Sequence, residues 1–229
     1  DDAAGLSISE KLRSQIGGLQ QAQRNSQDGV SLVQTAEGAL DEVHSMLLRV
    51  RDLAVQFANG TLATADKAAI TAEVAQLCNE ISRIGAQTKF NGVSLLTGGA
   101  TITFQIGIDD GQSLTVAAAQ LFGAGSTNSV DSGIFNFTGT TIIASIDTAI
   151  ANVSSARSTF GSVQNRLEHT LNNLAVYEEN LTASESRIRD VDMASEMVNF
   201  TKTQILQQAG TSMLAQANQA PQSVLSLLR

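Results

Sequence analysis

Residues 163–191 read VQNRLEHTLNNLAVYEENLTASESRIRDV, and this stretch decides the fold. Apolar and small side chains recur in it at alternating steps of four and three residues. That spacing is the heptad repeat of a coiled coil, in which one face of a helix packs against a partner helix. We predict a long helix whose seam is formed by Val163, Leu167, Leu174, Tyr177, Leu181 and Ile188, with Thr170 and Ser184 as small polar exceptions.

The first part of the chain predicts two more helices. Residues 2–58 contain no Pro, and an amphipathic stripe follows them: Leu32, Ala36, Leu40, Val43, Leu47, Val50, Ala54 and Phe57. Asn59-Gly60 is a stop signal for the first helix. The second helix is expected to start with Thr64 or Asp66 as its cap, and its stripe is Ile70, Val74, Leu77, Ile81 and Ile84.

The middle of the chain has a different pattern. Over residues 89–140 Gly and Thr become frequent and charged residues become scarce. Apolar residues alternate with polar ones before and after the turn sequence Asp109-Asp110-Gly111, which predicts a β-hairpin: Ile102, Phe104 and Ile106, then Leu114 and Val116. Residues 123–139 predict a loop with one further short strand.

Long helices at both ends of the chain indicate a hairpin topology. A helix over residues 147–192 would be about 70 Å long at 1.5 Å per residue. A compact globule of this chain length would be only about 35–40 Å across. We therefore expect a mainly α fold, a long antiparallel coiled-coil rod with a small β-hairpin insertion. The expected divisions are residues 1–97, 98–140, 141–190 and 191–229.

The last segment, residues 193–229, is amphipathic and rich in Gln. Pro221 is expected to open a short final helix. Nothing else in the sequence is an obvious mate for the apolar surface of this segment, so we expect a partner protein to cover it. Because the chain starts at Asp1 rather than Met, further residues are expected upstream. The apolar surface consists of Met193, Met197, Phe200, Ile205, Leu206, Met213, Leu214, Val224, Leu225, Leu227 and Leu228.

Composition argues against several classes of function. The net charge is −8, and no basic cluster is present to bind nucleic acid. No run approaches the length of apolar sequence that a membrane-spanning helix needs, so no membrane partner is expected. With one Cys an internal disulfide is impossible, and two His leave little for a metal cage.

Catalytic motifs are not found either, so we expect neither an enzyme nor a cofactor. Cys78 lies far in sequence from His44 and His169, and a nucleophilic Cys needs an activating base close by. Its simplest interpretation is a small apolar residue at the edge of a helix seam. The sequence has no phosphate-binding Gly-rich loop and no paired His motif of a metalloprotease.

Several strings along the chain resemble bacterial flagellin. The coverage is nearly complete, apart from residues 98–139. The strings are DDAAGLSISEK (1–11), NSQDG (25–29), QTAEGAL (34–40), LRVRDLAVQ (48–56), TKFNG (88–92), VQNRLEH (163–169), ESRIRDVDMA (185–194), LAQANQ (214–219) and LLR (227–229).

The resemblance implies a subunit of the flagellar filament. In that family, helices from both chain ends pack in the filament wall and the terminal segments line its central channel. The subunit is made in the cytoplasm, leaves through the flagellar type III apparatus, and is secreted into the flagellum. By resemblance, an export chaperone first covers the C-terminal segment. Contacts with the chaperone or the filament core are expected from Met197, Phe200, Ile205, Leu206, Met213, Leu214, Val224, Leu225 and Leu228.

The resemblance also implies an immune receptor as a partner. Arg49, Leu53 and Glu73 occupy positions that toll-like receptor 5 contacts in the family. Arg49 and Leu53 are four residues apart and are expected to share a helix face. The alternative is a solvated ionic surface on a helix pair.

Three other functions were weighed against a filament subunit. A hook–filament junction protein has similar ends but is present in few copies. A helical signalling adaptor would explain the coiled coil and leave the terminal strings unexplained. An enzyme would need a nucleophile and base pair, a metal spacing or a phosphate loop.

Overall fold

The computed structural model describes residues 3–97, 101–117, 121–122 and 142–227, and side chains within them up to residue 218. The chain divides into two compact units. One consists of residues 12–182, and the other consists of residues 1–11 and 183–229. The predicted loop and strand over residues 123–139 lie outside the described residues.

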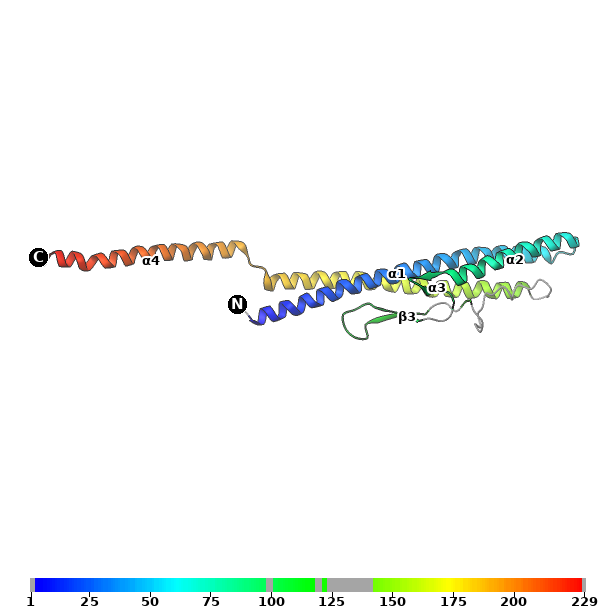
Figure 1. The fold of residues 1–229 in the computed structure, drawn as a ribbon, viewed down its shortest axis with the longest axis horizontal. Helices are drawn as coiled ribbons and strands as arrows, with labels where there is room; N and C mark the ends of the chain where they lie inside the picture. The colour runs from blue at the N-terminus through cyan, green and yellow to red at the C-terminus, as the bar shows by residue number, and fades with distance from the viewer. Residues whose placement is uncertain (1–2, 98–100, 118–120, 123–141, 228–229) are drawn as a thin grey trace. The chain divides into compact units, whose positions relative to one another are not determined.

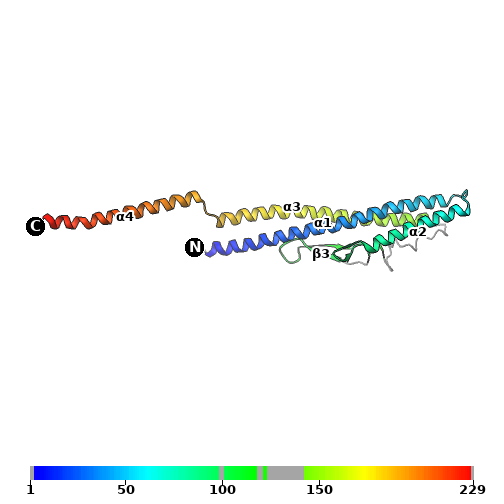
Figure 2. The same ribbon diagram turned by 45° about the horizontal axis from the view of Figure 1, so that its top comes forward.

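Three long helices run through the larger unit. They are α1 (Ala3–Phe57), α2 (Thr64–Gln87) and α3 (Ile142–Arg189). Within this unit the three lie side by side in both views (Figures 1 and 2). The predicted fold class is confirmed, because the fold is mainly α, with long helices from both ends and a small β insertion between them.

Ion pairs show that α1 and α3 are antiparallel. Arg51 Nε lies 2.7 Å from Asp147 Oδ1, and Arg157 Nη1 lies 2.9 Å from Asp41 Oδ1. Asp41, the earlier residue on α1, pairs with the later residue on α3, and Arg51 pairs with the earlier one. The two helices therefore run in opposite directions. Exposed ion pairs of this kind add little stability, so the apolar cluster between the helices must supply most of it.

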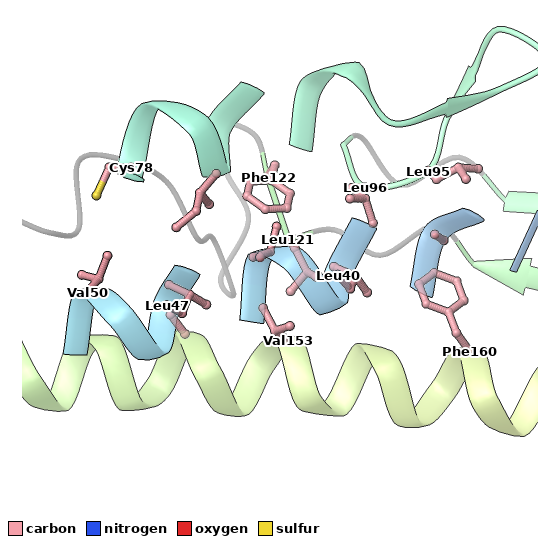
Figure 3. Packing of buried hydrophobic residues seen from close by; sticks show 14 of the residues in the cluster. Leu40, Leu47, Val50, Cys78, Leu95, Leu96, Leu121, Phe122, Val153 and Phe160 are labelled. Carbon is pink, nitrogen blue, oxygen red and sulfur yellow. The ribbon is translucent and has the colours of Figure 1, made fainter. Parts of the chain in front are cut away.

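The buried cluster of the larger unit draws on all three helices and on segments between α2 and α3. Leu40, Leu47 and Val50 of α1 are fully buried, as is Val153 of α3. Figure 3 shows Val153 and Phe160 projecting from α3 towards α1. Most of the stripe predicted for α1 is thus confirmed as core, with Phe57 only partly buried.

The predicted β-hairpin is present. β3 (Thr101–Gln105) pairs antiparallel with β4 (Ser113–Ala117), and Phe104 lies opposite Leu114. Leu114 and Val116 are buried. A Cβ placed on Gly29 of α1 would lie 3.6 Å from the Phe104 ring. The apolar face of the hairpin therefore packs on the helices, as the alternation predicted.

A second, smaller hairpin was not predicted from the sequence. β1 (Lys89–Phe90) pairs with β2 (Val93–Ser94) around a two-residue turn. Asn91 and Gly92 in this turn have φ of 48° and 80°. Positive φ at both positions is the signature of a type I′ turn, for which Asn-Gly is the preferred sequence.

Phe122, which follows β4, packs on α2 at Gly85, where there is no side chain. A Cβ on Gly85 would lie 2.5 Å from Cγ of Phe122, so only Gly leaves room for that ring. The backbone N–H of Phe122 donates to the carbonyl of Leu96, 3.2 Å away. Leu96 and Phe122 are both buried, and Figure 3 shows them close together above α1.

The start of α2 differs from the prediction. Ala63, rather than Thr64 or Asp66, occupies the N-cap position. Asp66 still satisfies the helix start, because its Oδ2 accepts the backbone N–H of Ala63 at 3.2 Å. The carboxylate acts from the third helical position, as in the second half of a capping box.

The smaller unit contains α4 (Met193–Leu227). Asp192 caps it, since its Oδ1 accepts the backbone N–H of Ala194 at 2.9 Å. The helix continues through Pro221, so the separate final helix expected there is not formed. In the same unit the Ser9 hydroxyl donates to Glu185 Oε1 at 3.2 Å. No helix in the described part of the chain is long and apolar enough to cross a membrane.

Candidate interaction surfaces

The first candidate surface is formed by α1 and α2. Nε and Nη2 of Arg49 both donate to Oε1 of Glu73, at 2.9 and 2.7 Å. The two side chains are 56% and 45% exposed. The structure thus joins two of the predicted receptor residues in one accessible ion pair that bridges neighbouring helices.

Leu53, the third predicted receptor residue, is only 2% exposed and belongs to the core. Arg49 and Leu53 were expected to share one helix face, but only Arg49 is exposed on it. Residues four apart are rotated by about 40° around a helix. Because Arg49 lies at the edge of the buried stripe, this rotation places Leu53 inside it.

The second candidate surface is the seam of α3 against α1. Val163, Leu167 and Leu174 are buried as the heptad pattern predicts. Leu174 packs with Leu19 and Ala22 of α1, and Leu181 is partly buried against the same cluster. The seam of the larger unit is therefore apolar through Leu174 and begins to open beyond it.

Two predicted seam residues are not buried. Tyr177 is 42% exposed and Ile188 is 43% exposed. Beside Tyr177, the two carboxylate oxygens of Glu178 accept the side-chain amides of Gln20 and Gln23, each at 2.7 Å. Polar side chains thus join α1 to α3 at this level, and the tyrosine is left towards solvent.

The Glu178 contact was missed from the sequence. Each glutamine donates to a different carboxylate oxygen, so the contact fixes both rotation and register of the two helices. Gln and Glu are ordinary surface residues of a helix, and only knowledge of the register between α1 and α3 could have paired them.

The third candidate surface is α4, whose large apolar side chains are exposed as far as residue 218, where the described side chains end. Each of those described lies between 55% and 67% exposed: Met193, Met197, Val198, Phe200, Ile205, Leu206, Met213 and Leu214. Among the predicted contact residues, Val224 and Leu225 lie where only the backbone is described, and Leu228 lies outside the described residues.

Apolar side chains of α4 point in opposite directions. Met197 and Leu206 are nine residues apart, which is two and a half helical turns, so they lie on opposite sides. The helix carries only Glu196 and Lys202 as charged residues. The large apolar side chains are therefore spread around α4 among polar ones and do not form the single apolar face expected of an amphipathic segment. Such a spread is typical of a helix enclosed on several sides.

Two of the residues considered for catalysis, His44 and Cys78, lie on the neighbouring helices α1 and α2. Cys78 is buried, and burial raises the pKa of its thiol to about 11. A thiol of that pKa is a poor nucleophile at neutral pH. Nδ1 of His44 is buried and has no hydrogen-bond partner among the described residues. No group of three metal-binding side chains is assembled in the part of the chain that the structure describes.

Comparison with protein families accounts for the helices at both ends of the chain. The family model for the bacterial flagellin N-terminal helical region matches residues 1–101. The model for the bacterial flagellin C-terminal helical region matches residues 143–228. The two matches leave out residue 229 and residues 102–142, which contain most of the β3–β4 hairpin.

Curated relatives agree along the whole chain. A flagellin of Halalkalibacterium halodurans is 52% identical over 232 aligned residues, covering 100% of this chain and 85% of the relative. A flagellin of Bacillus subtilis is 48% identical, with 100% and 87% covered. Flagellin FlaB2 of Treponema pallidum is 45% identical, with 100% and 86% covered.

Solved structures share the fold. Bacillus cereus flagellin matches with a TM-score of 0.59 at 37% identity, covering 66% of this chain and 88% of that one. A Vibrio parahaemolyticus chain described as a flagellar hook-associated protein has a TM-score of 0.50 at 14% identity, covering 82% and 95%, and shows the fold alone. The family matches and the high identities to flagellins together place this chain in the bacterial flagellin family, whose members are structural subunits of flagellar filaments rather than enzymes.

Proposed function

We propose that this chain assembles with further copies of itself into the flagellar filament, and that α4 is its main assembly surface. The observation that carries the proposal is the exposure of every large apolar side chain described on α4. Such a surface is unfavourable in water unless a partner removes it from solvent. Residues 191–229 are accordingly proposed as a terminal segment separate in role from the helices of the larger unit.

The distribution of apolar residues supports neighbours on more than one side. One hollow on α4 is lined by Met197, Ile205 and Leu206. A partner that filled it would leave Leu214 in water, because Leu214 is nine residues from Ile205 and lies on the opposite side of the helix. In a filament wall each helix has neighbours all round, and both sides are buried. The lack of charge after Lys202 also suits such an environment, because buried unpaired charges are strongly unfavourable.

Before assembly the same surface needs cover, and we propose an export chaperone for this role. The exposed Met193, Met197 and Met213 support the proposal, because unbranched thioether side chains adapt to different partners. Passage through the flagellar type III apparatus follows as part of this proposal. Its support is a core held by apolar packing with one free cysteine and no disulfide to break.

Assembly is tested with a chimera in which this chain replaces the matching stretch of Bacillus subtilis flagellin. The chimera is expressed in a strain that lacks flagellin, and cells are imaged by electron microscopy. We expect filaments, and we expect Leu206→Ser to shorten or abolish them. Val176→Ser is the matched control, since this apolar residue of α3 is similarly exposed but lies outside α4.

Two results would contradict the proposal. Secreted chimera that never forms filaments would favour the alternative of a hook–filament junction protein. Filaments that tolerate Leu206→Ser but not Val176→Ser would move the assembly surface from α4 to α3. Secretion is scored separately by immunoblotting of the medium, so that failed export is not mistaken for failed assembly.

We further propose that toll-like receptor 5 recognises the α1–α2 surface through Arg49 and Glu73, with Leu53 supporting it from the core. Support comes from the exposed ion pair, which offers a donor fork and a carboxylate side by side. Arg49→Ala is expected to reduce receptor signalling. Arg83→Ala, which removes a comparable exposed pair with Glu80 on α2, should leave signalling unchanged. Equal signalling by the two variants would contradict the receptor site.

A further inference from the structure

The chain contains two Asn-Gly pairs in the part that the structure describes, and they are held very differently. Asn59-Gly60 follows α1, and Asn91-Gly92 forms the turn between β1 and β2. Neither pair takes part in the surfaces described above. Both asparagines are exposed, so the difference between them is one of conformation rather than access to water.

Asn-Gly sequences are prone to a spontaneous reaction that needs no enzyme. The backbone nitrogen of Gly loses its proton and attacks the side-chain Cγ of Asn, so that an N–Cγ bond forms. The Cγ–Nδ2 bond then breaks, and the amide group takes up a proton and leaves as ammonia. Water then opens the five-membered succinimide at one of its two carbonyls, giving aspartate or isoaspartate. Gly is the successor that hinders this attack least, because it has no Cβ and rotates freely.

The turn conformation protects Asn91. With φ of 48° at Asn91 and 80° at Gly92, the pair adopts a left-handed type I′ turn. In this conformation the nitrogen of Gly92 and the Cβ of Asn91 lie on opposite sides of the Cα–C bond. The attack therefore requires the turn to rotate, and the pairing of Phe90 with Val93 opposes that rotation.

Asn59 is held differently, by a hydrogen bond from its backbone N–H to the carbonyl of Gln56 at 3.1 Å and not by strand pairing. It lies in the connection between α1 and α2, outside any paired strand. The backbone N–H of Thr61 donates to Asn59 Oδ1 at 3.3 Å, which keeps the side-chain carbonyl beside the main chain that follows it and draws electrons from Cγ. A Cβ placed on Gly60 meets no atom within 4 Å apart from its chain neighbours, so packing from the rest of the chain does not hold this position rigid.

We propose that Asn59 is a site of spontaneous deamidation, and that the folded chain converts it to aspartate and isoaspartate while Asn91 is spared. The reaction adds one negative charge after the C-terminus of α1, where the helix dipole disfavours it. Isoaspartate also adds a methylene to the main chain of the α1–α2 connection. The product is a substrate for enzymes of the isoaspartyl carboxyl methyltransferase class.

The test compares both sites within one sample. Purified chain is incubated at mildly alkaline pH, folded or in urea, and digested for peptide mapping by mass spectrometry, with isoaspartate detected by methyltransferase labelling. In the folded chain we expect modification at Asn59 to be about tenfold faster than at Asn91, equivalent to about 1.4 kcal/mol in barrier height. In urea the two rates should converge, because the turn no longer holds Asn91.

Gly60→Ala is the matched variant. The space around Gly60 is open and the structure gives it no positive φ, so Ala fits without strain and only shields the nitrogen. The variant should slow modification at Asn59 and leave thermal unfolding and the Asn91 rate unchanged. Equal rates at the two sites in the folded chain, or undiminished modification in Gly60→Ala, would overturn the proposal.

Discussion

The unit of residues 12–182 and helix α4 are both rich in apolar residues, but they use them in opposite ways. In the larger unit the leucines and valines of α1 and α3 are fully buried against one another. On α4 every large apolar side chain described is more than half exposed. Apolar content alone therefore does not distinguish a residue that holds the subunit together from one that joins it to another.

Arrangement around the helix does distinguish them. The apolar residues of α1 form one stripe at steps of three and four, which one neighbouring surface can cover. Those of α4 lie on opposite sides, which no single neighbour within a subunit can cover. A stripe predicts packing inside the chain, and a spread of apolar residues around the helix predicts assembly.

The largest expected contrast comes from truncating one leucine in each region. Leu40→Ala removes a fully buried side chain and should cost about 2–5 kcal/mol of unfolding free energy. Leu206→Ala should change it by less than about 0.5 kcal/mol, since the side chain is exposed in the subunit. Urea unfolding followed by circular dichroism measures both. A comparable loss from Leu206→Ala would mean that α4 is packed inside the subunit.

A thiol in each region gives a chemical version of the same contrast. Burial raises the pKa of Cys78 from 9.0 to about 11, so its thiolate at pH 8 is about a hundredfold scarcer than that of an ordinary thiol. A cysteine placed on α4 by Ser212→Cys should be alkylated by iodoacetamide far faster, as measured by mass spectrometry. In urea the two thiols should react alike.

The raised pKa of Cys78 also sets a direction for stability. The folded chain keeps the thiol proton more tightly than the unfolded chain does. This contribution is complete below pH 9 and is lost as pH rises towards 11. Cys78→Ala should therefore flatten the fall of stability over that range. An unchanged pH profile in the variant would assign the fall to other groups.

Replacing one glycine in the larger unit and one on α4 by Ala should also have opposite effects on stability. Gly85→Ala would place a Cβ 2.5 Å from the Phe122 ring, and we expect a loss of about 1–3 kcal/mol in urea unfolding. Gly210→Ala on α4 meets no atom within 4 Å and should strengthen that helix by about 0.5–1 kcal/mol. Amide hydrogen exchange along α4 measures the second effect. Slower exchange supports an open helix, and faster exchange would indicate an unseen contact.

The smallest effect is expected at the surface of the larger unit. Arg49→Ala removes one exposed ion pair and should change unfolding free energy by less than about 1 kcal/mol. Leu53→Ala, four residues further along α1, should cost several times more because Leu53 is buried. Thermal unfolding of the two variants side by side tests the assignment. Equal losses would contradict the burial of Leu53.

The sequence was sufficient to predict the helices, the β3–β4 hairpin and most of the buried stripe, because regular spacing reports which side of an element faces the core. It was insufficient at the edges of that stripe. Leu53 was left out of the predicted stripe and is buried, whereas Tyr177 follows the heptad spacing of α3 and is exposed. Whether a residue at the edge of a stripe is buried depends on which side chain lies next to it on the neighbouring helix.

Polar contacts between helices and short turns were also not predicted from the sequence. The bonds from Gln20 and Gln23 to Glu178 depend on the register between α1 and α3, which no local pattern contains. The β1–β2 hairpin was missed although Asn91-Gly92 is a strong hairpin signal, because its strands are too short to show alternation. The continuation of α4 through Pro221 also contradicts a local rule.

The exposure of α4 has a thermodynamic consequence for growth of a filament. Most helices in proteins owe their stability to packing rather than to propensity, and α4 contains both Gly210 and Pro221. In the assembly proposed above, ordering of this helix is coupled to its burial, and the lost conformational entropy offsets part of the gain. We expect each addition to be individually reversible, with a large decrease in heat capacity as its calorimetric signature.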